Sequence, residues 1–195
     1  MSEPSELLLE ACVCGDQQSW AALVKRYEKQ VARQMWRFSR DRLVWEELVQ
    51  DVFVELYYSL PRYRRTGVPF EHWLRRIATR VGYRHWKRKG RERSVELHDQ
   101  WQSAAPGPAE SMEASDAARM LHELLAKLPA ADRLVLTLMY FEECDTREIA
   151  KRTGWNRAMV KMRLMRARRK LKVIAEASEL PNRFESLTHG NVAVD

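Results

Sequence analysis

The stretch from Asp145 to Lys172 constrains the fold of this chain more than any other part of the sequence. Asp145 is placed to cap one helix, and Glu148 stands three residues later, where it completes a capping box. Gly154 supplies a tight turn, since glycine enters positive φ at little cost. Asn156 is then placed to cap a second, longer helix. The stretch therefore predicts a helix-turn-helix.

The second of these helices is predicted to have one apolar and one basic face. Its apolar positions recur at three- and four-residue spacing; they are Met159, Val160, Leu164, Ala167 and Leu171. The cations assigned to the outer face are Arg157, Lys161, Arg163, Arg166, Arg168, Arg169, Lys170 and Lys172. Acids normally alternate with bases on a solvated face, and none occurs here. The pattern favours a helix in the DNA major groove, with the solvated face of an ordinary helical hairpin as the alternative.

Composition and charge predict an all-α protein made of two small helical domains. The 195 residues include few glycines and prolines, and Leu, Ala, Glu and Arg are frequent, which favours helices. We expect an N-terminal domain over 1–93 and a C-terminal domain over 119–174 that carries the helix-turn-helix. Residues 94–118 contain five acids and no Lys or Arg, so they are interpreted as a flexible acidic linker. Residues 175–195 are expected to form a disordered tail.

The segment from Asp41 to Leu60 is predicted to be an acidic helix that presents a docking surface. Trp45, Leu48, Val49, Val52, Leu56 and Leu60 are assigned to its buried face, and Glu46, Glu47, Gln50, Asp51, Phe53 and Val54 to the other side. An exposed Phe53 among acids is typical of an aromatic anchor with a charged rim. The alternative is that Phe53 belongs to the core.

The segment from Leu60 to Arg93 is strongly basic, with twelve Lys/Arg against two acids. A loop over 62–69 precedes a helix that begins near Phe70. The helix is expected to bury Phe70, Trp73, Leu74, Ile77 and Val81, and to carry cations on its other side: Arg75, Arg76, Arg80, Arg84, Lys87 and Arg88. Tyr83, His85 and Trp86 lie among them. Aromatic rings among cations suit single-stranded nucleic acid, although these three residues fit a core equally well.

No metal, cofactor or catalytic residue is expected. Cys12, Cys14 and Cys144 cannot all pair, and no secretory signal precedes them, which favours a reducing, cytoplasmic location. Cys12 and Cys14 would lie on opposite faces of a short helix, and no His–Cys set at metal spacing completes a site. No apolar run approaches the length of a membrane span.

Six segments, in order, resemble the extracytoplasmic-function (ECF) sigma factors of bacterial RNA polymerase. They are Trp20 to Tyr27, Glu47 to Phe53, Pro69 to Ala78, Leu128 with Pro129, Glu148 to Ala150, and Val160 to Leu171. The resemblance covers most of residues 5–173. It implies a non-catalytic subunit that binds core RNA polymerase, recognises the minus-thirty-five and minus-ten promoter elements and assists melting.

The resemblance also implies roles for individual residues. Core polymerase would contact Leu48, Gln50, Asp51 and Phe53. The minus-ten element, as duplex and as melted non-template strand, would contact Tyr63, Arg64, Arg65, Trp73, Arg76, Arg80, Tyr83, Arg84, Trp86 and Lys87. The minus-thirty-five element would contact Arg157, Lys161, Met162, Arg163 and Arg166. Leu138 to Glu142 would meet the polymerase flap, the acidic linker would thread toward the active-site cleft, and an anti-sigma partner is expected.

The sequence departs from the family pattern at three places. Arg80 stands where a small polar residue is usual, Arg84 replaces a common Asp, and Glu143-Cys144 replaces a frequent Gly-Leu. The departures at Arg80 and Arg84 fall where the family reads promoter sequence, so they bear on which minus-ten sequence is preferred and not on the fold. A stand-alone helix-turn-helix regulator is the alternative function, but it needs a dimer interface to read paired half-sites, and no heptad pattern provides one. An enzyme is the third class of function, and it would need clustered carboxylates or a His/Cys constellation. The sequence offers no second carboxylate cluster at metal-site spacing with Glu46, Glu47, Gln50 and Asp51, which disfavours an enzyme.

Overall fold

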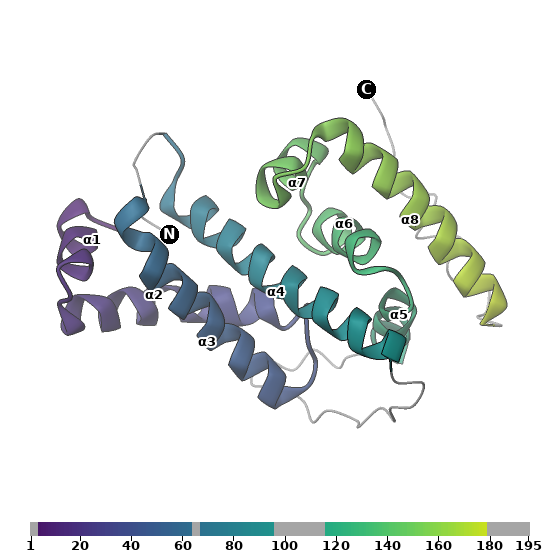
Figure 1. The fold of residues 1–195 in the computed structure, drawn as a ribbon, viewed down its shortest axis with the longest axis horizontal. Helices are drawn as coiled ribbons and strands as arrows, with labels where there is room; N and C mark the ends of the chain where they lie inside the picture. The colour runs from purple at the N-terminus through teal and green to yellow at the C-terminus, as the bar shows by residue number, and fades with distance from the viewer. Residues whose placement is uncertain (1–3, 64–66, 96–115, 179–195) are drawn as a thin grey trace.

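The computed structural model describes residues 4–63, 67–95 and 116–178, and in these ranges the chain is helical without a strand (Figure 1). The helices are α1 (Glu6–Val13), α2 (Gln17–Met35), α3 (Arg42–Ser59), the 3₁₀ turn η1 (Leu60–Arg62), α4 (Phe70–Val95), α5 (Asp116–Ala126), α6 (Ala130–Tyr140), α7 (Thr146–Thr153) and α8 (Arg157–Ala177). The predicted all-α fold is confirmed. We call residues 4–95 the N-terminal half and residues 116–178 the C-terminal half.

Local capping signals in the sequence decide where four of the helices begin. The carboxylate of Asp16 accepts a hydrogen bond from Ser19 N at 2.8 Å, and that of Asp41 accepts one from Val44 N at 3.1 Å. Asp145 accepts from Glu148 N at 2.7 Å, and the side chain of Asn156 accepts from Met159 N at 2.7 Å. Each bond satisfies an amide that has no partner inside its helix. The caps predicted at Asp145 and Asn156 are therefore confirmed.

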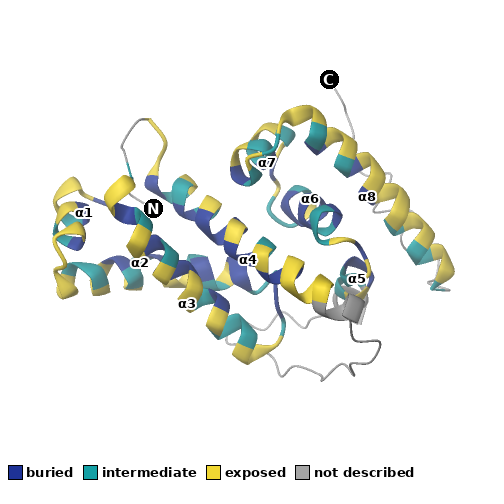
Figure 2. Cartoon of the chain, in the orientation of Figure 1, coloured by how far each residue is buried: buried dark blue, intermediate teal, exposed yellow. Residues whose placement is uncertain are grey.

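The long helix α4 lies across the middle of the molecule and contacts elements of both halves (Figure 1). It packs against α2 and α3 on one side and against α6 and α7 on the other. Its buried residues include Leu74, Ile77 and Val81, and α6 is buried almost throughout, from Leu134 to Leu138 (Figure 2). The buried side chains of the two halves form one hydrophobic cluster. The sequence predicted two helical units but not that they share a core.

The expected linker and tail fall mostly on residues that the structure does not describe. Helix α4 continues to Val95 and α5 begins at Asp116, so the central part of the expected 94–118 linker, residues 96–115, lies outside the described residues. Helix α8 continues to Ala177, beyond the expected end at 174, because Ile174 still packs against the core cluster. The tail from 179 onward also lies outside the described residues.

Among the described residues no helix is both long and apolar enough to cross a lipid bilayer. The cysteines are free: Cys12 and Cys144 are buried, and Cys14 is exposed. Burial raises the pKa of the Cys144 thiol to about 11, so this thiol stays protonated near neutral pH.

Two glycines of α4 provide a matched test of how closely the helices pack. A Cβ atom at Gly82 would overlap the ring of Phe38, whereas one at Gly90 would meet nothing within 4 Å. We expect Gly82→Ala to lower the free energy of unfolding by about 1–3 kcal/mol, because forced overpacking outweighs the better helix propensity of alanine. Gly90→Ala should raise it by up to about 1 kcal/mol. Urea unfolding followed by circular dichroism measures both, and equal effects would contradict the packing at Gly82.

Candidate nucleic-acid and protein interfaces

Helices α7 and α8 form the predicted helix-turn-helix. Gly154 ends α7 in the left-handed conformation, with φ of 76°, and its amide donates to the carbonyl of Ala150. The inner face of α8 is buried at Val160, Leu164 and Ala167, and it packs on α6. The second half of the expected capping box is replaced by an ion pair, because the Glu148 carboxylate accepts from Arg152 Nε at 2.8 Å.

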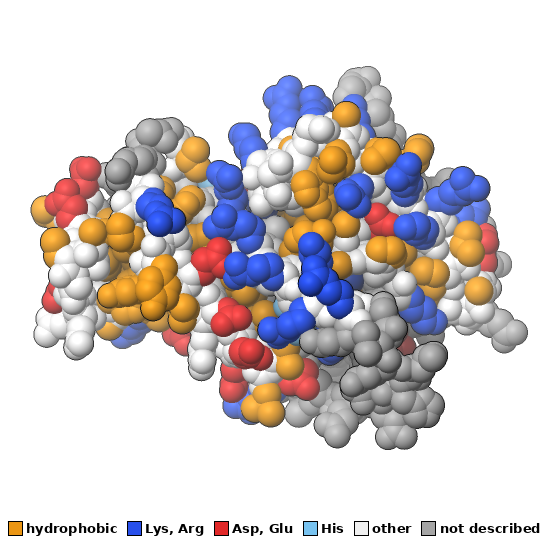
Figure 3. Space-filling model, viewed as in Figure 1, with side chains coloured by type: hydrophobic (Ala, Val, Ile, Leu, Met, Phe, Trp, Pro, Cys, Tyr) orange, Lys and Arg blue, Asp and Glu red, His pale blue; other side chains and the backbone are white. Residues whose placement is uncertain are grey.

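The outward face of α8 presents several of the predicted minus-thirty-five residues. Lys161, Met162 and Arg166 are exposed, as is Arg169 one turn further along the helix. Arg157 is exposed at the helix start, and its Nε donates to Thr146 Oγ1 at 3.1 Å. Lys and Arg side chains gather along α8 and over α4 on the face shown in Figure 3. This face can neutralise phosphates along a groove.

The expected placement of Arg163 on the outer face is wrong. Its guanidinium lies 4.7 Å from the ring centroid of Trp155, and its Nη1 is 3.8 Å from the carboxylate of Asp132. Asp132 is only 4% exposed and also binds Lys170 Nζ at 2.5 Å. A buried carboxylate is costly unless it is paired, and this acid pairs with Arg163 and Lys170, of which Lys170 stays exposed. The residue pattern gave no sign of it, because the acid lies on another helix.

The expected exposure of Phe53 is also wrong, and the alternative that it belongs to the core is confirmed. Phe53 is 9% exposed and Leu48 is 3% exposed. Helix α3 packs against both α2 and α4, so its buried arc is wider than the single stripe assumed from the sequence. Gln50 and Asp51 are exposed, and Val54 and Tyr58 continue the same exposed stripe. Leu48 and Phe53 support this surface from beneath.

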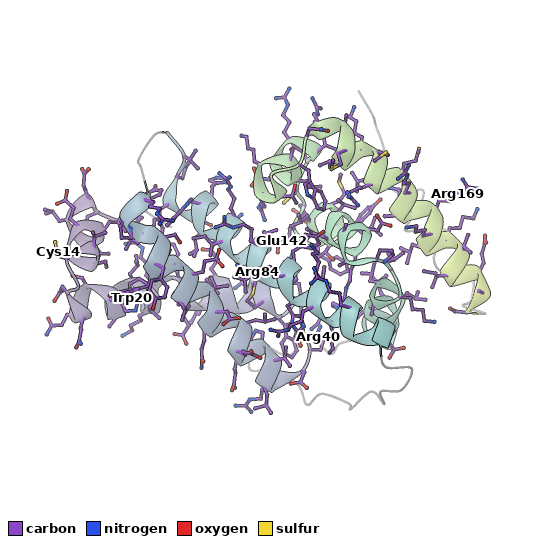
Figure 4. The ribbon with its side chains drawn as sticks, in the orientation of Figure 1. Cys14, Trp20, Arg40, Arg84, Glu142 and Arg169 are labelled. Atoms are coloured by element: carbon purple, nitrogen blue, oxygen red, sulfur yellow. The ribbon has the colours of Figure 1, made fainter. Side chains whose placement is uncertain are left out.

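The cations of α4 are partly neutralised by one acid of α3. Arg80 Nη2 lies 3.1 Å from Glu55 Oε1, and Arg84 binds the other carboxylate oxygen of Glu55. Both arginines are exposed, as is Arg76, so their guanidinium groups remain accessible to a nucleic acid. Ion pairs this exposed contribute little to stability, and a phosphate can replace Glu55 at small cost. Arg84 is labelled in Figure 4.

The aromatic residues of α4 divide between core and surface. Trp86 is 5% exposed, and its Nε1 donates to the Phe38 carbonyl at 2.8 Å; His85 is 8% exposed. Both belong to the core, so the prediction of an exposed Trp86 that stacks on DNA is wrong. Tyr83 is half-buried against Trp155 of the C-terminal half, with ring centroids 5.8 Å apart, and Lys87 Nζ lies 5.8 Å from its ring centroid. The sequence could not show the contact of Tyr83 with Trp155, because it depends on how the two halves pack.

A second aromatic group surrounds the loop before α4. Tyr63 lies 4.7 Å from Trp73 and 5.4 Å from Phe70, between ring centroids, and its hydroxyl donates to the Val68 carbonyl at 3.1 Å. Phe70 is fully buried, whereas Tyr63 and Trp73 keep part of their rings accessible. The neighbouring Arg64 and Arg65 lie outside the described residues. The arrangement provides a supported ring surface beside the cations of α4.

Charged side chains join the two halves at a buried network around Glu142, which Figure 4 labels between α4 and α6. Arg152, 4% exposed, donates to Glu142 at 2.9 Å and to Glu148 at 2.8 Å. From the turn after α2, the Arg37 guanidinium lies 3.1 Å from the Glu142 carboxylate and also donates to the Phe141 carbonyl. Below this network, the guanidinium carbon of Arg133 lies 4.0 Å from the ring centroid of Trp86. The sequence pattern gives no sign of this network, because its members come from separate parts of the chain, although Glu143-Cys144, a departure from the family pattern, lies beside it.

Comparison with known proteins identifies the family. Residues 23–92 match the family model for sigma-70 region 2, and residues 118–171 match the model for sigma-70 region 4. The two matches follow one another in a single chain and fall on the two halves of the fold. The chain belongs to the sigma-70 family and, with relatives that carry the ECF name, to its ECF sigma factors. The predicted resemblance is therefore confirmed.

The ECF sigma factor is similar to several relatives over most of its length. It is 29% identical to the ECF RNA polymerase sigma factor SigE of Mycolicibacterium smegmatis over 157 residues, which is 79% of this chain and 60% of SigE. It is also 29% identical over 189 residues to the "Probable RNA polymerase sigma factor RfaY" of Xanthomonas campestris pv. campestris, covering 94% of this chain and 46% of that protein. The chain thus spans about half the length of these two relatives.

A solved structure shares the fold of this sigma factor. The sigma factor RpoE of Bartonella quintana, solved with the anti-sigma factor NepR, superposes with a TM-score of 0.58 at 20% identity. The likeness covers 83% of this chain and 99% of that one.

Two histidines, the buried His85 and the half-buried His122, make the stability of the fold depend on pH. Burial, together with nearby cations, lowers the pKa of His85 to about 4 and that of His122 to about 3. Above pH 6.5 both histidines are neutral in the folded and the unfolded chain. Below pH 6.5 the unfolded chain takes up a proton on each histidine while the folded chain does not, so the folded state loses stability as the pH falls. Between pH 6.5 and 5 we expect the free energy of unfolding to decrease, by at most about 1.4 kcal/mol per pH unit for each histidine.

Urea unfolding at pH 7, 6 and 5 measures this dependence. In His122→Gln the slope should be shallower, because one of the two titrating groups is gone. The amide oxygen of Gln can still accept from Arg40, whose Nη2 lies 2.8 Å from His122 Nε2. An unchanged slope in this variant would contradict the assignment.

Proposed function

We propose that this ECF sigma factor is a promoter-specificity subunit that binds core RNA polymerase, recognises two promoter elements and assists strand separation. The observation that carries the proposal is the succession of sigma-70 regions 2 and 4, each of which coincides with an exposed cationic helix face. The protein supplies binding energy and no chemistry of its own, and it acts in the cytoplasm with the polymerase.

The second helix of the helix-turn-helix contacts the minus-thirty-five element. Arg157, Lys161, Met162 and Arg166 lie on the exposed side of α8, toward its N-terminal end, where a recognition helix meets base edges. Arg163 acts here as an anchor of the helix, because Asp132 and Trp155 hold its guanidinium.

Helix α4 and the loop before it contact the minus-ten element. Arg76, Arg80, Arg84 and Lys87 are exposed along α4 and can neutralise phosphates of duplex DNA and of the melted non-template strand. Tyr63 and Trp73 offer partly accessible rings on which an unstacked base can lie, an interaction of about 1–3 kcal/mol per base. Tyr83 becomes available to DNA once its contact with Trp155 opens. The buried Trp86 holds α4 in place through its hydrogen bond to the Phe38 carbonyl.

Core polymerase binds the exposed stripe of α3 that contains Gln50 and Asp51. These side chains face solvent, while Leu48 and Phe53 fix their position through the core. An anti-sigma partner is part of the proposal, since the RpoE relative of similar fold was solved with one. Leu138 to Glu142 would meet the polymerase flap in the open form, and the acidic linker would thread toward the active-site cleft. The domain boundaries at 93, 118 and 174 remain predictions.

A stand-alone helix-turn-helix regulator is the competing function. It would use α7 and α8 alone and would leave region 2 without a function. Purified chain with core polymerase and a genomic DNA library distinguishes the two functions by run-off transcription. Promoter-specific transcripts that require both components support the sigma factor. Tight, specific binding to duplex DNA without polymerase, and no transcript with it, would reject the proposal.

Removal of the exposed Asp51 carboxylate should weaken the complex with polymerase. We expect Asp51→Ala to raise the dissociation constant about fivefold to tenfold, as for a charged contact within an interface. Glu28→Ala is the matched control, because Glu28 is an exposed acid on α2, away from this stripe. Fluorescence anisotropy with labelled sigma factor measures both. Equal affinities for the two variants would remove Asp51 from the interface.

Phe53→Ala cannot serve the same purpose. Deletion of a buried Phe ring costs about 3–5 kcal/mol of stability, so any loss of polymerase binding would reflect unfolding.

Loss of Lys161 or Arg166 should weaken promoter binding by the holoenzyme and lower its dependence on salt. Each cation that neutralises one phosphate contributes about one unit to the slope of log affinity against log salt. Lys172→Ala is the control, because Lys172 pairs with Glu176 at 3.8 Å near the end of α8. Filter binding at salt concentrations from about 50 to about 200 mM, a range that includes physiological ionic strength, measures the slope. An unchanged slope in both Lys161→Ala and Arg166→Ala would place the DNA elsewhere.

A further inference from the structure

The exposed side of α8 carries two methionines between its cations. The exposed positions recur at three- and four-residue spacing and form one stripe: Ala158, Lys161, Met162, Met165, Arg166 and Arg169. Met162 is 39% exposed and Met165 is 67% exposed. Methionine at such exposure contributes nothing to the core. Its position within a cationic stripe indicates a surface that contacts a polyanion and an apolar group together.

The rest of α8 is held by the protein itself, so the orientation of this stripe is fixed. Val160, Leu164 and Ala167 pack inward against α6, and Asp132 holds Arg163 and Lys170 on the flank. Arg163, the cation that lies between Met162 and Leu164 in the sequence, is thereby turned toward Asp132, with 31% of its side chain exposed. The side chains left to meet a ligand at the centre of the stripe are therefore Met162 and Met165.

We propose that Met162 and Met165 recognise thymine in the minus-thirty-five element through apolar contact with its 5-methyl group. This inference rests on the proposed function and adds a reading mechanism to it, with Met165 as a further contact residue. Thymine is the one base that displays a methyl group in the major groove. The unbranched thioether chain of methionine adapts to such a contact, while Lys161 and Arg166 on either side neutralise the flanking phosphates.

The spacing of the two methionines limits where the thymines lie. Residues three apart on a helix are separated by about 4.5 Å along its axis, and successive base pairs rise by about 3.4 Å. Met162 and Met165 therefore reach bases within about two steps of each other. A protein partner could also cover two methionines, but the uncompensated Lys161, Arg166 and Arg169 around them favour DNA.

Replacement of thymine by deoxyuridine tests the proposal, because it removes the methyl group and leaves the base pairing intact. The holoenzyme first selects its upstream element from a duplex library randomised at those positions. Each thymine of the selected element is then replaced singly, on either strand, and the affinity of the holoenzyme is measured. Met162→Ala and Met165→Ala are compared with the unmodified chain. Both residues are exposed and alanine is a good helix former, so the variants keep the fold.

We expect deoxyuridine at one or two neighbouring positions to weaken binding of the unmodified holoenzyme about threefold to fivefold, the effect of one lost methyl burial. At one of these positions deoxyuridine should not weaken binding of the Met165→Ala holoenzyme, because this variant already lacks the side chain that contacts the methyl group. Val173→Ala is the control: Val173 is an exposed apolar residue of α8 two turns beyond Met165, and its holoenzyme should keep the full sensitivity to deoxyuridine.

Three results would overturn the proposal: no thymine in the selected element, tolerance of deoxyuridine at every position, or the same sensitivity in Met165→Ala as in the unmodified chain. If Met162→Ala and Met165→Ala weaken capture of core polymerase and leave the deoxyuridine series unchanged, the methionines bind protein and the proposal fails. A chain that captures no polymerase would overturn the proposed function and this inference together. Loss of binding in Lys161→Ala with a flat deoxyuridine series would overturn the inference alone.

Discussion

The arrangement of this sigma factor depends on one side chain, Trp86, that is held by both halves at once. Its indole nitrogen donates to the Phe38 carbonyl at 2.8 Å, which fixes α4 against the end of α2. Its ring faces the Arg133 guanidinium of α6 at 4.0 Å. A tryptophan in the interior needs a partner for its N–H group. Trp86 finds this partner in the N-terminal half, and its ring binds a cation of the C-terminal half. Arg76, Arg80 and Arg84, which precede Trp86 on α4, keep exposed side chains.

Local signals predicted much of the fold because they act within a few residues. Asp16, Asp145, Gly154 and Asn156 decide helix ends through their own backbone conformation and side-chain bonds, so the sequence alone was enough for them. Phe53 and Arg163 were assigned to the wrong faces because their environment comes from other helices. Helix α3 is covered on two sides, and Arg163 follows a carboxylate that lies more than thirty residues away in the sequence.

Acids placed under the cationic faces determine which cations a ligand can meet. Asp132 is buried and holds the half-buried Arg163 and the exposed Lys170, whereas Glu55 is half-buried and binds Arg80 and Arg84, which remain exposed. The buried acid fixes its cations, since separation would leave an unpaired charge in the interior. The half-buried acid only orients its cations. Net charge along a helix is therefore a poor guide to the part of it that reads DNA, and the position of each counter-ion is the better one.

The seam between the halves contains a large share of charged and aromatic contacts, from Arg37 and Glu142 to Tyr83 and Trp155. When the seam opens, its charged groups are hydrated again, which aliphatic side chains are not. The hydration free energy therefore offsets much of the cost of breaking the ion pairs between the halves. The molecule is thus built with a preferred line of separation. Separation along that line would break these charged and aromatic contacts first, and it would also expose the apolar side chains that the two halves share in one cluster.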